Sequence, residues 1–379
     1  MTSAIAVEFD VSTLPEIYGP DLGRIRASKR RQADVWAHRT PDRWPIIFGS
    51  PLTGRQESIP RPNLEEAFND SALMLCAGVR GACRVANSRA DGVPSIRANL
   101  GTGICMSTLG LTQLVFPDKM PWLRDHLTRE QAAKLTPEDI TIRGDFGRGL
   151  DMMRLFKEVM GDVLDVFCMD TQGPFDLAHL LLGDEVFLLP YDDPGLMRHV
   201  MEICLQIGIK THTWMKEVSG EPRGALAHSN GLYAENMGIR ICEDTTALIG
   251  RELMDEYAMP YTRRLAAHFG GAWVHYCGRN DHLTAAVCEC DEVRGVNFGI
   301  IPGRPHEHDF AKDMELIASS GKVYYGHWVP FEGESKRDWL RRIHDWSARG
   351  ALIETGGNTC LGEGGFETEA DALAFWESL

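Results

Sequence analysis

The feature that most constrains the fold is a series of short β-type runs separated by long helical segments. Strands joined by tight turns run antiparallel, whereas parallel strands need long crossover connections, which are usually helices. The pattern therefore predicts parallel strands with helices packed outside them. The eight runs are Trp44 to Phe48, Gly92 to Leu100, Val163 to Met169, Gly238 to Cys242, Ala272 to Tyr276, Gly295 to Gly299, Lys322 to Gly326 and Ala351 to Thr355.

The helical segments between these runs are long enough to be crossover connections. Asp193 to Glu217 opens with Asp-Asp-Pro, which places Pro194 near a first helical turn, and it carries apolar residues at helical spacing. The other predicted helices are Gly250 to Phe269, Glu307 to Ser319, Ser335 to Ala348 and Thr368 to Leu379. Two alternatives to this element count are a ninth strand over Gly224 to Ser229 and a subdomain within 101–162.

Eight parallel strands with outer helices define an α/β fold of the (β/α)8 TIM-barrel type, and an open doubly wound sheet is the main alternative. Residues 1–40 are polar, with a helical composition over Asp21 to His38. We therefore expect an N-terminal helical extension at 1–40 and a single barrel domain at 41–379. The sequence contains no repeat of 20 to 50 residues, which favours a single domain.

Composition narrows the classes of partner and the compartment. The 379 residues include 39 Lys and Arg against 54 Asp and Glu, a formal charge of -15, which disfavours nucleic acid and anionic membranes as partners. The ten cysteines are scattered, and no apolar stretch is long enough to cross a bilayer. These observations predict a cytoplasmic protein with reduced thiols and a small-molecule substrate. Phosphate-loop and nucleophile-elbow motifs are missing from the sequence.

Catalytic side chains of such barrels come from the C-terminal ends of the strands. His275 and Cys277 are the sharpest pair there, because alternate residues of a strand point to the same side. Imidazole and thiolate suit zinc, and Cys360, just past the last strand, is the best third ligand by position. Packing of buried cysteines is the competing explanation, and Asp281-His282 with Cys288 and Cys290 is a competing cluster. Asn297 and His327 also lie at strand ends and are expected to face the substrate.

Several motifs occur in an order that is similar to the uroporphyrinogen decarboxylase superfamily, which includes the decarboxylase and zinc-dependent, corrinoid-linked methyltransferases. The resemblance covers 163–379 and implies a (β/α)8 barrel. The motifs that carry it are Gln172-Gly173-Pro174-Phe175, Tyr191-Asp192-Asp193-Pro194, Glu243-Asp244, Met259-Pro260-Tyr261, Val274-His275-Tyr276-Cys277-Gly278, Gly326-His327 and Thr355-Gly356-Gly357.

The methyltransferase branch resembles this chain in its His-x-Cys motif and in a cysteine after the last strand. The resemblance implies zinc at His275, Cys277 and Cys360, where an acceptor bound at the open position is activated for methyl transfer from a corrinoid or tetrahydrofolate-type carrier. Glu243 and Asp244 would act as a fourth ligand or a proton acceptor, with His327 beside them. A corrinoid protein and a second copy in a homodimer are the expected partners.

Two alternatives stay open at this point. A metal-free decarboxylase acting on a porphyrinogen or a smaller acid would use Asp91 with arginines such as Arg55, Arg84 and Arg97. The family's arginine motif after the first strand is reduced here to Arg55 at best, which leaves the carboxylates of such a substrate without partners. A non-catalytic binding barrel, in which the polar strand ends are structural, is the second alternative.

Overall fold

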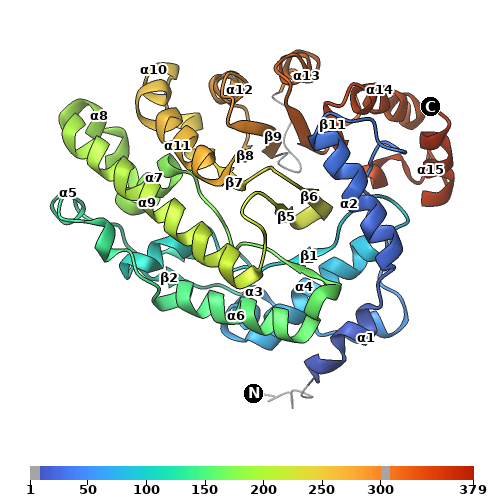
Figure 1. The fold of residues 1–379 in the computed structure, drawn as a ribbon, viewed down its shortest axis with the longest axis horizontal. Coiled ribbons are helices and arrows are strands. Elements are labelled where there is room, and N and C mark those ends of the chain that lie inside the picture. Colours follow the sequence, from blue (N-terminus) through green and yellow to red (C-terminus); the bar gives the residue numbers. More distant parts are fainter. Residues whose placement is uncertain (1–8, 300–307) are drawn as a thin grey trace.

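The computed structural model describes residues 9–299 and 308–379, in which helices surround a central group of strands (Figure 1). The strands are β1 (Ser95–Ile96), β2 (Gln113–Leu114), β3 (Trp122–Leu123), β4 (Asp165–Val166), β5 (Leu226–His228), β6 (Leu232–Ala234), β7 (Ile239–Cys242), β8 (Ala272–Cys277), β9 (Val293–Gly299), β10 (Val323–Gly326) and β11 (Leu352–Glu354). The helices are α1 (Leu14–Tyr18), α2 (Leu22–Trp36), α3 (Leu64–Asn69), α4 (Ser71–Ala86), α5 (Arg129–Ala132), α6 (Gly144–Met160), α7 (Pro174–Leu182), α8 (Leu189–Asp192), α9 (Pro194–Ser219), α10 (Arg251–Leu253), α11 (Met259–Phe269), α12 (Asp281–Cys288), α13 (Phe310–Ser319), α14 (Lys336–Ala348) and α15 (Glu369–Glu377).

The C-terminal half of the chain builds one parallel sheet in the order β11-β10-β9-β8-β7. Each of these strands follows the preceding one along the chain through a helical connection, which is the arrangement that the sequence predicts. The strands are buried on both faces, because the helices cover one side and side chains fill the other. An α/β fold with a parallel sheet is therefore confirmed.

The first three predicted runs form much less ladder than the last five. β1 and β4 pair in parallel over two residues, and Pro94 precedes β1, where it cannot donate to a ladder. The first run forms an isolated parallel bridge, from Ile46 to Glu354 in β11. A second isolated bridge joins Gln172, beyond β4, to Cys242 in β7. These segments thus lie beside the two ends of the five-stranded sheet.

The predicted ninth strand exists as β5, but it pairs antiparallel with β6 in a hairpin rather than joining the parallel sheet. The segment 101–162 contains the short antiparallel pair β2 and β3 together with α5 and α6. Figure 1 shows the β5–β6 hairpin in the middle of the molecule, next to β7 and β8.

Helix α2 packs onto this hairpin and belongs to a second apolar cluster of the protein. Trp36 of α2 lies against Tyr325 of β10 and donates its indole N–H to the Tyr233 carbonyl of β6. The Gln32 amide donates to the carbonyls of Asp91 and Gly231. The N-terminal segment is therefore integrated into the core, although its sequence has no clear apolar stripe.

The predicted helices occur near their expected positions, with one interruption. Asp193 caps α9 by accepting the N–H of Leu196, and Ser335 caps α14 in the same way. The segment 250–269 is not one continuous helix: a π-helical turn separates α10 from α11, whose first turn contains Pro260. Glu307, the predicted start of the helix now seen as α13, and residues 1–8 lie outside the described residues.

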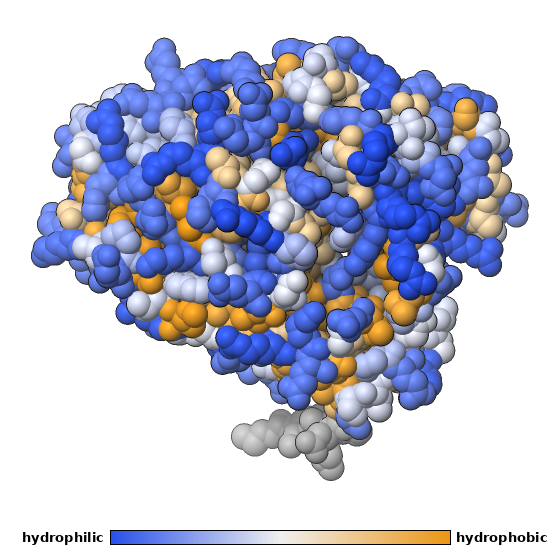
Figure 2. Space-filling view, viewed as in Figure 1, coloured by the Kyte–Doolittle hydropathy of each residue, from blue (hydrophilic) through white to orange (hydrophobic). Residues whose placement is uncertain are grey.

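The face of the molecule shown in Figure 2 is mainly hydrophilic, with apolar side chains in its lower half, where α6 and α4 lie in Figure 1. Within the described ranges, no helix is both long enough and apolar enough to cross a membrane.

Candidate metal centre and cavity

Three polar side chains occupy one level of the parallel sheet near the strand C-terminal ends. The strand register places Cys242 of β7 beside His275 of β8, and His275 beside Asn297 of β9. Neighbouring residues at the same level of adjacent strands point to the same face, so the three side chains converge. We call this set the polar row.

Asn297 fixes the orientation and the tautomer of His275. Its amide Nδ2 donates to the carbonyl of Tyr325 at 2.6 Å, which leaves Oδ1 to face the imidazole. Nδ1 of His275 lies 2.5 Å from that oxygen, so Nδ1 carries the proton. Nε2 therefore presents a lone pair, as a metal ligand requires.

Cys277 lies beside this lone pair. Its Sγ is 3.5 Å from Nε2 of His275, which agrees with about 3.6 Å expected for a nitrogen and a sulfur bound to the same tetrahedral zinc ion. Gly299 of β9 makes room for the sulfur, because a Cβ at this position would lie 2.8 Å from Sγ. The pairing of His275 with Cys277 that the sequence indicates is thus present in the geometry.

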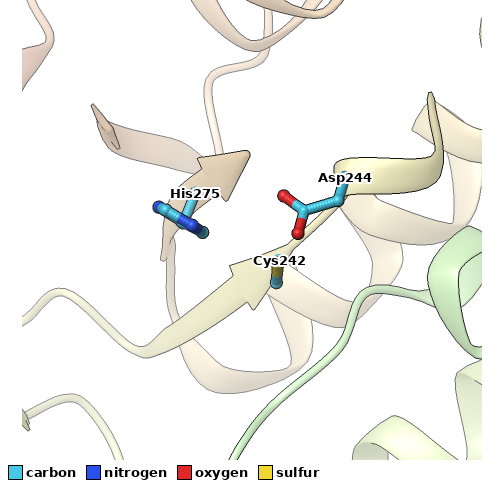
Figure 3. A group of neighbouring side chains, drawn as sticks. All are labelled: Cys242, Asp244 and His275. Atoms are coloured by element: carbon cyan, nitrogen blue, oxygen red, sulfur yellow. The ribbon is translucent and has the colours of Figure 1, made fainter. Parts of the chain in front are cut away.

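Asp244 adds a carboxylate to the same place. It begins the short 3-10 helix η8 (Asp244–Leu248) directly after β7, and its Oδ1 accepts the N–H of Cys277 at 2.6 Å. Candidate ligand atoms of Cys242, Asp244 and His275 lie within 4.8 Å of one another, and Figure 3 shows the three side chains facing a common point. Thiol, carboxylate and imidazole are all ligands that zinc accepts.

Burial keeps the two thiols and the imidazole neutral. Burial, followed by the charge of Arg240, lowers the pKa of His275 to about 4, so the imidazole is unprotonated at neutral pH. Burial, together with Asp244, raises the pKa of Cys277 to about 11, and burial raises the pKa of Cys242 well above its ordinary value. Both thiols must therefore lose a proton before they bind a metal ion.

A cavity of about 490 Å³ adjoins the polar row, within the size range of small-molecule sites. His275 and Asn297 line one part of it, and His327 lines another. His327 lies 2.7 Å through Nδ1 from Oε1 of the fully buried Glu354, which also accepts the N–H of Gly356. The prediction that His327 faces the site agrees with this geometry, and Glu354 orients the ring.

Cys360 does not join the predicted zinc ligands. It ends the 3-10 helix η10 (Gly357–Cys360), and its fully buried thiol donates to the carbonyl of Gly357 at 3.0 Å. Two strands, β9 and β10, separate β8 from the strand that precedes Cys360. Among the described residues, the group with metal-ligand spacing consists of Cys242, Asp244 and His275, so of the three predicted ligands it contains only His275.

Glu243 points away from the polar row, because it alternates with Cys242 and Asp244 along the chain. Its Oε1 accepts the hydroxyl of Thr262 on α11 at 2.6 Å, in the layer between strand and helix. Burial and the neighbouring Asp176 raise the pKa of Glu243 well above its ordinary value. The predicted role of Glu243 as a catalytic group or ligand therefore finds no support in its position.

Arg55 and Asp91, predicted to bind substrate, do not line the cavity. Arg55 is exposed in the 3-10 helix η2 (Gly54–Ser58) and pairs with Glu16. Asp91 is fully buried and forms ion pairs with Arg31 at 2.8 Å and Arg43 at 2.9 Å. Both residues are engaged in contacts that hold the N-terminal segment, which accounts for their positions without a substrate.

Two residues of β7 that are not among the predicted site residues also belong to the site. Cys242 ends a predicted strand, and Arg240 lines the cavity two residues earlier. The available signal for Arg240 was a charged residue inside the otherwise apolar strand Ile239–Cys242. The signal for Cys242 was its place at a strand end next to the strand of His275, which only the register makes informative.

Comparison with solved structures identifies the fold. A methyltransferase from Methanosarcina mazei matches with a TM-score of 0.60 over 93% of this chain and 98% of that chain, at 14% sequence identity. No protein-family model and no curated protein matches the sequence. The likeness shows that the two chains share an α/β fold along nearly their whole length.

Proposed function

We propose that this protein is a zinc-dependent methyltransferase whose metal centre lies at the polar row. The observation that carries the proposal is the convergence of Cys242, Asp244 and His275 within 4.8 Å, with Sγ of Cys277 at 3.5 Å from the imidazole. One solved structure that shares the fold is also a methyltransferase. At 14% identity this supports the class of reaction only through the shared architecture.

We further infer that the fold is a (β/α)8 barrel of irregular shape. The bridge from Ile46 to Glu354 and the bridge from Gln172 to Cys242 extend the five-stranded sheet at its two edges. β1 pairs with β4, and the Asp91 N–H donates to the Ile46 carbonyl, so the contacts continue from one edge to the other. Such a barrel would place the metal centre at its C-terminal face, where active sites of this architecture lie.

In this proposal, His275, Cys242 and Asp244 hold the zinc ion, and Cys277 is the adjacent thiol. Zinc bound there would lower the pKa of a thiol or hydroxyl acceptor and so make it nucleophilic. Asn297 keeps the imidazole lone pair directed at the ion through the bond to Nδ1. The methyl donor would be a corrinoid or tetrahydrofolate-type carrier, delivered by a partner protein, and the chain would work as a homodimer.

The metal-free decarboxylase is less compatible with this geometry. Asp91 has its own arginine partners and Arg55 lies on the surface, so both are outside the cavity, although Arg97, another residue of that hypothesis, lines it. A barrel that only binds ligands would keep the cavity but would have no use for a metal centre.

The test is zinc content by mass spectrometry on protein purified without chelators or nickel affinity. We expect about one zinc per chain in the wild type and in Cys360→Ser, and a loss in Cys242→Ser and His275→Ala. Absence of zinc from the wild type would contradict the proposal. Loss of zinc in Cys360→Ser but not in Cys242→Ser would favour the ligand set expected from the sequence over the one proposed here.

Activity is tested separately with methylcobalamin as the donor and small thiols as acceptors, followed by the change in corrinoid absorbance. We expect turnover in the zinc-loaded wild type and none after chelation. Undiminished turnover after complete zinc removal would contradict a role for the metal.

A further inference from the structure

A second cavity, of about 510 Å³, adjoins the one beside the polar row. One wall is helix α4, which contributes Ala77, Gly78, Gly81 and Ala82, and a Cβ built at Gly81 meets no atom within 4 Å. The small side chains of α4 therefore leave an open space, and six of the other twelve lining residues have apolar side chains, while Arg84 and Arg97 are charged. We call it the α4 cavity.

Arg97 and Ser229 line both cavities, so the two spaces meet at these residues. Arg97 directly follows β1, and Ser229 directly follows β5, which brings the central hairpin to the junction. A molecule that reaches from the α4 cavity toward His275 must therefore pass the guanidinium of Arg97.

The junction carries an excess of positive charge. Arg97 and Arg240 both pair with the single carboxylate of Asp170, at 3.3 Å and 3.1 Å, and their side chains are 19% and 11% exposed. Burial raises the pKa of Asp170, but the two arginines outweigh burial and hold it below its ordinary value. Burial, followed by Arg240 and Arg97, also keeps His228 neutral by lowering its pKa well below the usual range.

Arg240 retains hydrogen-bonding capacity. Its Nη1 donates to Asp170 and to the carbonyl of Thr171, whereas its Nε, although buried, has no hydrogen-bond partner in the described part of the chain. A buried donor without an acceptor is costly, and a guanidinium edge suits an oxyanion. Asp244, the other carboxylate near Arg240, is engaged by the Cys277 N–H and belongs to the proposed metal centre.

We propose that the substrate is an amphipathic organic anion, whose carboxylate or similar oxyanion binds Arg97 and Arg240 while its apolar part occupies the α4 cavity. This inference rests on the proposed function, since it assigns the substrate class of the same site. Its anionic end would bind in the cavity that His275 also lines, and its apolar body would lie against α4.

The experiment is calorimetric titration of the full chain with 4-phenylbutyrate and with the uncharged 4-phenylbutyramide, in zinc-free and in zinc-loaded protein. We expect the acid to bind both forms and the amide to bind about tenfold more weakly or worse, because the charge-assisted bonds are lost. Arg97→Gln and Arg240→Gln should each weaken binding of the acid about tenfold, whereas Arg55→Gln should leave it unchanged.

A matched pair at Gly81 tests the apolar part. Gly81→Phe fills the α4 cavity and should weaken 4-phenylbutyrate binding about tenfold or more, while Gly81→Ala should leave it nearly unchanged. Neither change should unfold the helix, because both residues have a higher helix propensity than glycine. If Arg240→Gln does not fold, Arg97→Gln and the Gly81 pair decide the question.

Equal affinity for acid and amide, or full affinity in Gly81→Phe, would overturn the inference, as would absence of binding to the wild type. Binding of the acid by a protein that holds no zinc even when supplied with it would support this substrate class while defeating the proposed methyl transfer. The two proposals can therefore fail independently.

Discussion

Replacing Asn297 with leucine tests whether the polar row is a metal centre rather than a set of packed polar residues. The substitution keeps the size of the side chain but removes the acceptor for Nδ1 of His275 and the donor to the Tyr325 carbonyl. The imidazole then loses the bond that fixes its tautomer and its direction, so Nε2 no longer presents its lone pair reliably.

The expected cost follows from the loss of this single support. Removal of the partner that orients a metal-bound histidine weakens metal binding about 10- to 100-fold, which corresponds to about 1.4 to 2.7 kcal/mol. Zinc affinity is measured by competition with a chromophoric chelator at pH 7. The control is Asn87→Leu, which removes the bond from Asn87 to the Pro51 carbonyl, remote from the cavity. Unchanged zinc affinity in Asn297→Leu, or an equal loss in Asn87→Leu, would refute the reasoning.

Two further predictions concern pH and stability. Burial raises the pKa of Cys242 well above its ordinary value, and this thiol must ionise to bind zinc. Zinc affinity should therefore rise by about tenfold per pH unit, and calorimetry in buffers of different ionisation enthalpy should detect the released proton. Asp91→Asn breaks the ion pairs with Arg31 and Arg43. It should lower the free energy of unfolding, measured by urea titration, by about 3 to 5 kcal/mol and leave the zinc content unchanged. A loss of zinc without a loss of stability would instead place Asp91 in the metal site.

The sequence predicts the C-terminal half of the fold well, because its strands are short runs rich in apolar residues that alternate with helical segments. β7 to β11 appear in the expected order, and His275 and Cys277 share a face as strand alternation requires. The first three runs are poorer predictions, since Pro94 and polar residues such as Arg97 limit the ladder around β1 to two residues. The ligand set could not be derived from spacing: Cys360 is close to a strand end in sequence, but its thiol turns into the core.

What the sequence does not encode visibly is the register between neighbouring strands, and here it depends on a bulge. Ala272 lies opposite Val293, but Trp273 lies opposite Gly295, so Arg294 has no partner on β8. If Arg294 paired with Trp273 instead of bulging out, the ladder would place Val296 beside His275 and would turn Asn297 toward the opposite face.

The bulge allows the importance of strand register for zinc binding to be tested by a deletion and an insertion. Deletion of Arg294 removes the unpaired residue and keeps Asn297 opposite His275, so zinc affinity should stay within about threefold of the wild type. Insertion of one alanine between Gly295 and Val296 shifts the strand by one residue and should weaken zinc binding at least as much as Asn297→Leu. The same chelator competition measures both variants, and circular dichroism verifies that each is folded. Equal zinc affinity in folded insertion and deletion variants would mean that the Asn297 contact does not depend on register, and the polar row would lose its role in orienting the metal ligand.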